Sequence, residues 1–99
     1  MQDDAKTARA REIQRDIGRI LLRDWDPIGV RDVPEAQDEY ESYVGGVYQL
    51  LAAGSSPQRV AEHLSALETD RMGLNHVWPH DLLPVAEKLC RLDVRIKNE

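Results

Sequence analysis

Carboxylates are the side chains of this sequence most able to carry chemistry, because seven of them fall within residues 24–41. Only one base, Arg31, lies in that stretch, so its net charge is −6, whereas the whole chain carries −5. The seven acids are Asp24, Asp26, Asp32, Glu35, Asp38, Glu39 and Glu41. Hard divalent cations require several carboxylate oxygens, but the spacing does not match the D-x-[DN]-x-[DN]-G loop of an EF-hand. We therefore expect a solvated acidic face and no metal site.

Other nucleophiles and metal ligands are sparse. His76 and His80 stand four residues apart, as zinc ligands on a helix do, but Pro79 between them argues against a continuous helix. Cys90 has no base near it in the sequence and His63 is distant, so we expect a half-buried, unreactive thiol. The chain has neither a phosphate-binding glycine loop nor a G-x-S-x-G motif. These observations predict that the protein is not an enzyme and needs no cofactor.

The pentapeptide WDPIG predicts a rigid bend. Asp26 can accept a hydrogen bond from the backbone N–H two residues on, Pro27 presets the turn, and Gly29 tolerates a positive φ. Trp25 would anchor the bend by burying a large ring, and its indole N–H then needs a partner. The segment can hold one conformation without a ligand, and the alternative interpretation is a recognition loop.

Length and composition limit what the chain can be. Its 99 residues have room for one modest core, so we expect a single helical domain over residues 1–99. One cysteine cannot form an intramolecular disulfide, and the first residues alternate in charge instead of showing the basic start and apolar run of a secretory signal. No apolar stretch reaches the roughly 20 residues needed to cross a bilayer. We expect a cytoplasmic protein with no membrane partner and, because acids repel phosphates, no nucleic-acid partner.

Two helices are predicted in the first half of the chain. The first should span about residues 7–23, because Ile13, Ile17 and Ile20 recur with helical spacing. Arginines beside that stripe are interpreted as a solvated surface; they are Arg9, Arg11, Arg15 and Arg19. The second should begin near Asp38 and end before Gly54, with an apolar face wide enough for a central helix. It contains Gly45 and Gly46, each costing about 1 kcal/mol relative to alanine, for which we expect a close backbone approach or a kink.

Two more helices are predicted in the second half. The third should begin at Ser55-Ser56-Pro57-Gln58, a serine cap followed by proline, and end near Met72-Gly73. Residues 74–80 read as a loop. The fourth should begin at Asp81 as its N-cap and carry Val85, Leu89, Leu92 and Ile96 on one stripe. The sequence therefore predicts an all-α fold, a small four-helix bundle with ordered loops after its first and third helices.

The WDPIG corner, the D-E-Y-x-x-Y pattern at residues 38–43 and the Met72-Gly73-Leu74 ending resemble a group of short bacterial proteins. That group is a domain-of-unknown-function family with a W-D-P-[IL]-G corner and a D-E-Y helix. The resemblance covers about residues 17–74 and implies a helical fold. By analogy it also suggests an immunity or defence-associated role.

The sequence favours an acidic protein-binding module, with an immunity or inhibitor protein of a bacterial toxin or defence system as its specific form. The expected partner is another protein with a basic surface, and the expected binding residues are Trp25, Asp26, Pro27, Ile28, Gly29, Asp38, Glu39, Tyr40 and Tyr43. Two alternatives stay open. One is a metal-assisted hydrolase using Asp26, Asp38 and Glu39; the other is a homo-oligomeric structural protein that pairs through the broad face of the second helix.

Overall fold

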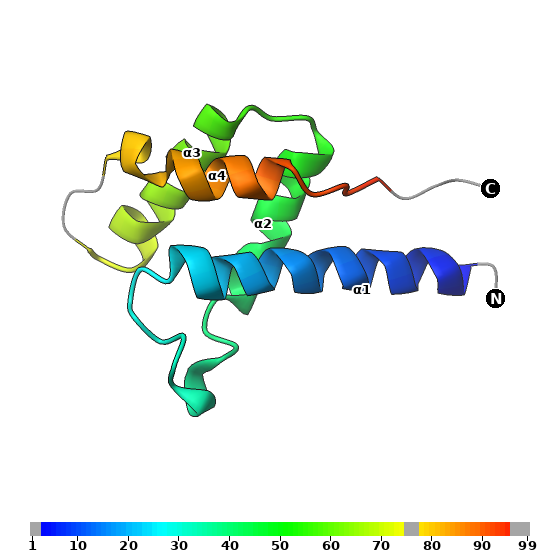
Figure 1. Ribbon diagram of the computed structural model, residues 1–99, viewed down its shortest axis with the longest axis horizontal. Helices are drawn as coiled ribbons and strands as arrows, with labels where there is room; N and C mark the ends of the chain where they lie inside the picture. The colour runs from blue at the N-terminus through cyan, green and yellow to red at the C-terminus, as the bar shows by residue number, and fades with distance from the viewer. Residues whose placement is uncertain (1–2, 75–77, 96–99) are drawn as a thin grey trace.

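The computed structural model describes residues 3–74 and 78–95, and within this part of the chain it contains helices and turns but no strand (Figure 1). The four α-helices are α1 (Asp3–Ile20), α2 (Glu41–Ala52), α3 (Pro57–Ala66) and α4 (Leu83–Cys90). The predicted all-α, four-helix fold is confirmed. No helix in the described residues is long and apolar enough to cross a membrane.

The helices pack in the cyclic order α1, α2, α3, α4 and back to α1. Helix α1 lies beside α4, which runs in the opposite direction, and α2 crosses α1 (Figure 1). Helix α3 packs against both α2 and α4. Helix α2 packs mainly on α1 and α3, so its wide apolar face is shared between these two neighbours.

The core forms where the apolar stripes of the helices meet. Its fully buried large side chains are Ile13, Ile17, Leu21, Val47, Val60, Leu64 and Leu89. Each such side chain stabilises the fold by about 1.5–3 kcal/mol relative to its exposed state. Trp25 and Tyr40 belong to the same buried cluster, so the corner after α1 is anchored in the core.

The first two helices differ from the predicted boundaries. Helix α1 begins at Asp3, before the expected residue 7, because the alanine, lysine and arginine residues there are good helix formers. It then continues into a π-helical turn, Leu21–Trp25. Helix α2 starts at Glu41 and not near Asp38, since the chain before it forms a 3-10 turn, Pro34–Ala36, and further turns.

The last two helices follow the predicted signals in part. Ser56 caps α3 by accepting a hydrogen bond from the Arg59 N–H at 3.2 Å, as expected. A π-helical turn, Leu67–Arg71, ends it. Helix α4 is preceded by a 3-10 turn, Pro79–Leu82, so Asp81 is not its N-cap and part of the expected loop is helical. The helix ends at Cys90, before Leu92, while Ile96 and His76 lie outside the described residues.

Only one of the two glycines inside α2 has a structural reason. A Cβ atom on Gly46 would lie 3.3 Å from Nε2 of His63, so the close approach is made by a side chain and not by the expected backbone. A Cβ atom on Gly45 would meet nothing within 4 Å, and nothing in the structure explains that glycine.

Candidate functional site

The corner after α1 is produced by one residue in an unusual backbone conformation. Asp26 has φ 36° and ψ 58°, in the left-handed region that aspartate tolerates better than most residues. Its N–H donates to the carbonyl of Leu21 at 2.8 Å, which completes the π-helical turn. Gly29 follows with φ 68°, as predicted, and its N–H donates to the carbonyl of Asp26 at 3.2 Å. These two residues turn the chain away from α1.

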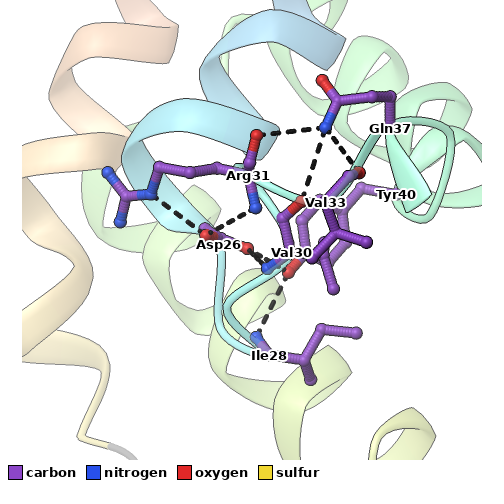
Figure 2. Close-up of polar contacts among 7 residues, drawn as sticks. All are labelled: Asp26, Ile28, Val30, Arg31, Val33, Gln37 and Tyr40. Atoms are coloured by element: carbon purple, nitrogen blue, oxygen red, sulfur yellow. Dashed lines mark hydrogen bonds and ion pairs between the residues drawn. The ribbon is translucent and has the colours of Figure 1, made fainter. Parts of the chain in front are cut away.

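The Asp26 carboxylate holds the loop that follows it (Figure 2). Its Oδ1 accepts hydrogen bonds from the Val30 N–H at 2.7 Å and the Tyr40 hydroxyl at 2.8 Å. Its Oδ2 accepts from the backbone N–H and the Nε of Arg31, both at 3.1 Å. The expected hydrogen bond from the Ile28 N–H to the Asp26 carboxylate is not made, and the Ile28 N–H donates instead to the Tyr40 hydroxyl at 3.2 Å. The reason is that the Asp26 carboxylate lies over the N–H groups four and five residues along the chain.

Protonation at this corner follows from its hydrogen bonds. Burial alone would raise the pKa of Asp26, but the donors of Val30, Tyr40 and Arg31 outweigh burial and lower it below its ordinary value. Burial raises the pKa of the Tyr40 hydroxyl, and the neighbouring Asp26 charge raises it further. At neutral pH the carboxylate is therefore ionised and the phenol protonated. Asp26 acts as a fixed anion that organises backbone N–H groups, and not as a proton-transfer group.

Trp25 ties the corner to two other helices. Its indole N–H donates to Oε2 of Glu68 at 2.7 Å, a buried contact that supplies the partner the sequence requires. Its ring lies 5.4 Å from the Tyr40 ring and 6.2 Å, edge-on, from the Tyr43 ring. Sequence reasoning missed Glu68, although it follows the buried Leu64 by four residues and thus falls on the apolar stripe.

Residues 27–39, here called the acidic loop, project away from the helices (Figure 1). The exposed Gln37 amide bridges the loop by donating to the carbonyls of Arg31 at 3.0 Å and Val33 at 2.9 Å (Figure 2). On its surface Ile28 and Val33 are 41% and 40% exposed. Its exposed acids are Asp32, Glu35, Asp38 and Glu39. The loop thus combines a fixed backbone with exposed apolar and acidic side chains.

The nine predicted binding residues divide by burial. Trp25, Asp26 and Tyr40 are buried and contact only other parts of this chain. Pro27 and Tyr43 are half-buried. The exposed ones are Ile28, Gly29, Asp38 and Glu39. The structure therefore brings all nine to one region but leaves only its outer layer available to a partner.

The carboxylates named in the hydrolase alternative do not share one environment. The Asp26 side chain is 1% exposed and both of its oxygens are occupied by donors, whereas Asp38 and Glu39 are exposed. Asp24, outside the loop, forms an ion pair with Lys88 at 3.0 Å. In the described part of the chain, no three histidine, cysteine or acidic side chains gather in a metal-binding group.

An open groove of about 850 Å³ lies between α1 and the start of α2, and Tyr40 is one of the residues that line it. Four arginines of α1 and of the turn after it line the groove at intervals of four residues: Arg11, Arg15, Arg19 and Arg23. Gln37, Tyr40 and Glu41 also line it. From the sequence, Arg11, Arg15 and Arg19 were interpreted as solvated surface and Arg23 was not considered, although the regular four-residue spacing indicates that these arginines share one side of a helix.

Comparison of the chain with protein-family models, with curated proteins and with solved structures gives no match. The resemblance drawn from the WDPIG corner stays a prediction. The proposed function must therefore be argued from the corner, the acidic loop and the groove themselves.

Proposed function

We propose that this chain is an acidic protein-binding module and that the acidic loop is its recognition element. One observation carries the proposal: Ile28 and Val33 are exposed among carboxylates on a loop whose backbone is already fixed by Asp26 and Gln37. Exposed aliphatic side chains at fixed positions are suited to fill pockets of a partner. The surrounding acids favour a partner with a basic surface.

The internal hydrogen bonds of the loop lower the entropic cost of binding. Immobilising a flexible side chain or loop residue at an interface costs about 0.5–1.5 kcal/mol each. Asp26, Tyr40 and Gln37 order this loop before any partner arrives. The buried residues of the predicted site therefore support binding by holding Ile28, Val33 and the acids in place.

An inhibitor or immunity protein is the specific form of this proposal. Such a protein would cover a basic site of a toxin with the acidic loop, as the resemblance to defence-associated proteins suggests. Opposite charges on the two surfaces would speed their encounter, and this effect would weaken as salt increases.

Affinity capture from the native host followed by rate measurements tests the proposal. The loop variant Asp38→Lys/Glu39→Lys is compared with Glu62→Lys/Asp70→Lys, which makes the same change in net charge at exposed positions on α3 and the turn after it. We expect the wild type and the control variant Glu62→Lys/Asp70→Lys to capture a basic protein. Its association rate with the loop variant should fall by about tenfold or more at low salt.

A variant of the two exposed aliphatic residues of the loop tests their contribution to affinity without changing the net charge. Ile28→Ser/Val33→Ser leaves the net charge unchanged, so it should speed dissociation of the captured protein without slowing its association. Capture that is empty, or equally strong with the loop variant and its matched control, contradicts the proposal.

A further inference from the structure

The groove beside α1 is lined by four arginines, three of which form no ion pair within the described part of the chain. Successive arginines along it are separated by about 6 Å of helix rise. Arg19 is within 3.5 Å of Asp16, an exposed pair of little energetic weight. Among the described residues, Arg11, Arg15 and Arg23 form no ion pair, whereas Arg9, which is not a groove residue, donates to Glu12 and to the carbonyl of Asp93.

The border of the groove is acidic. Glu41 lines it directly, and Asp38 and Glu39 are exposed between Gln37 and Tyr40, which line it too. A nucleic-acid strand would meet these carboxylates as well as the arginines, and its phosphates would be repelled by them. The charge pattern therefore fits an occupant with acidic side chains that contact the arginines and basic side chains that contact the acidic border.

The chain itself has such a surface. Its acidic loop presents four exposed acids, and its groove presents four arginines, side by side on the same molecule. Two neighbouring patches of opposite charge are self-complementary under a two-fold rotation, because the rotation places each patch of one copy against the other patch of its mate.

We propose that the arginine groove binds the acidic loop of a second copy of this chain in a two-fold symmetric dimer. Each dimer contains the loop-to-groove contact twice, and Val33, whose carbonyl accepts from Gln37 at the edge of the groove, is covered in it. This interface differs from the α2 face considered in the sequence analysis. A second copy would compete with a basic partner for the acidic loop.

A mixing experiment with two charge-reversed variants tests the dimer directly. The groove variant is Arg15→Glu/Arg19→Glu, and the loop variant is again Asp38→Lys/Glu39→Lys. Alone, each variant places like charges in both contacts, so its dimer dissociation constant should rise by more than about tenfold. Mixed in equal amounts, they place opposite charges in both contacts and should form a heterodimer. Light scattering and sedimentation of the purified chains measure the mass of each sample.

Matched variants separate local from overall charge. Arg59→Glu/Arg91→Glu carries the same net charge as the groove variant, and Glu62→Lys/Asp70→Lys carries that of the loop variant; all four positions are exposed. Both controls should dimerise like the wild type. Circular dichroism melting curves establish that every variant is folded.

A wild type that stays monomeric at high micromolar concentration overturns the dimer, as does a mixture of the two variants that stays monomeric. Titration with a labelled single-stranded oligonucleotide and with poly-glutamate tests whether the groove binds a nucleic acid or another acidic chain instead. Binding of either by a monomeric wild type, lost in the groove variant, would assign the groove to that ligand instead. The mixing experiment uses only the purified chain, whereas the capture experiment depends on a basic partner. A failure to dimerise would therefore not affect the test of the proposed function.

Discussion

Tyr40 belongs to both the Asp26 corner and the arginine groove, but charged side chains have different environments in these two regions. At the corner one carboxylate is buried and its four hydrogen bonds all come from within the chain. In the groove several guanidinium groups are exposed, and only Arg19 has an acidic neighbour within ion-pair distance among the described residues. A satisfied buried charge stabilises a conformation, whereas exposed unpaired charges are available for another molecule. The comparison predicts that the corner controls stability and the groove controls association.

Removing the corner carboxylate should have the largest effect. Asp26→Ala leaves the Tyr40 hydroxyl and the N–H groups of Val30 and Arg31 without their acceptor. We expect the free energy of unfolding to fall by about 3 kcal/mol, because unpaired buried donors are costly but water can reach part of this loop. Urea denaturation followed by circular dichroism measures the change.

Two variants show which contact is responsible. The Arg31 side chain is 54% exposed, so its ion pair is screened and Arg31→Ala should cost less than about 1 kcal/mol. Asp38→Ala, an exposed acid of the same loop, should change stability by less than about 0.5 kcal/mol. If Asp26→Ala is as mild as Asp38→Ala, the corner does not depend on its carboxylate.

The corner also shows which structural features can be predicted from the sequence and which cannot. The bend at WDPIG and the positive φ of Gly29 were predictable, because aspartate, proline and glycine have strong local preferences. The donor Tyr40 and the acceptor Glu68 lie 14 and 43 residues from the groups they bind, so only the packing of the helices brings them there. Local propensity thus predicted the turn, while its hydrogen-bond partners required the fold.

Breaking the second buried contact of the corner should cost somewhat less. Glu68→Ala removes the acceptor of the Trp25 indole N–H, and we expect a loss of about 2 kcal/mol. Glu68→Gln keeps an oxygen acceptor of the same length and should retain most of the stability. Trp25 fluorescence during denaturation, in a Trp78→Phe background, reports the transition. Equal losses for Glu68→Ala and Glu68→Gln would mean that the hydrogen bond is not the source of the stability.

The stability that Asp26 supplies should depend on pH in one direction. Its pKa is lower in the folded chain than the ordinary 3.8, so folding favours the ionised form. That contribution is fully present above 3.8 and is lost as the pH falls through the folded pKa. The difference in unfolding free energy between wild type and Asp26→Asn should therefore narrow in acid. A difference that stays constant from neutral pH to below 3.8 would show that ionisation of Asp26 does not matter.

The arginines of the groove show what the sequence of α1 alone does not predict. Their four-residue spacing was visible, but helical periodicity alone does not reveal that Gln37 and Glu41 close the other side of a groove. That fact depends on the crossing of α1 and α2 and on the path of the acidic loop. A solvated surface and one wall of a groove have the same sequence pattern.

Substitution in the groove should have the smallest effect on folding. Arg15 is exposed, lines the groove and has no ion pair among the described residues, so Arg15→Ala removes little that the monomer uses. We expect its unfolding free energy to change by less than about 0.5 kcal/mol when measured at concentrations too low for association. The same substitution should weaken self-association, because a charge that has no role within the chain is then removed from the interface. A large loss of monomer stability would show that Arg15 supports the fold, and the contrast between corner and groove would not hold.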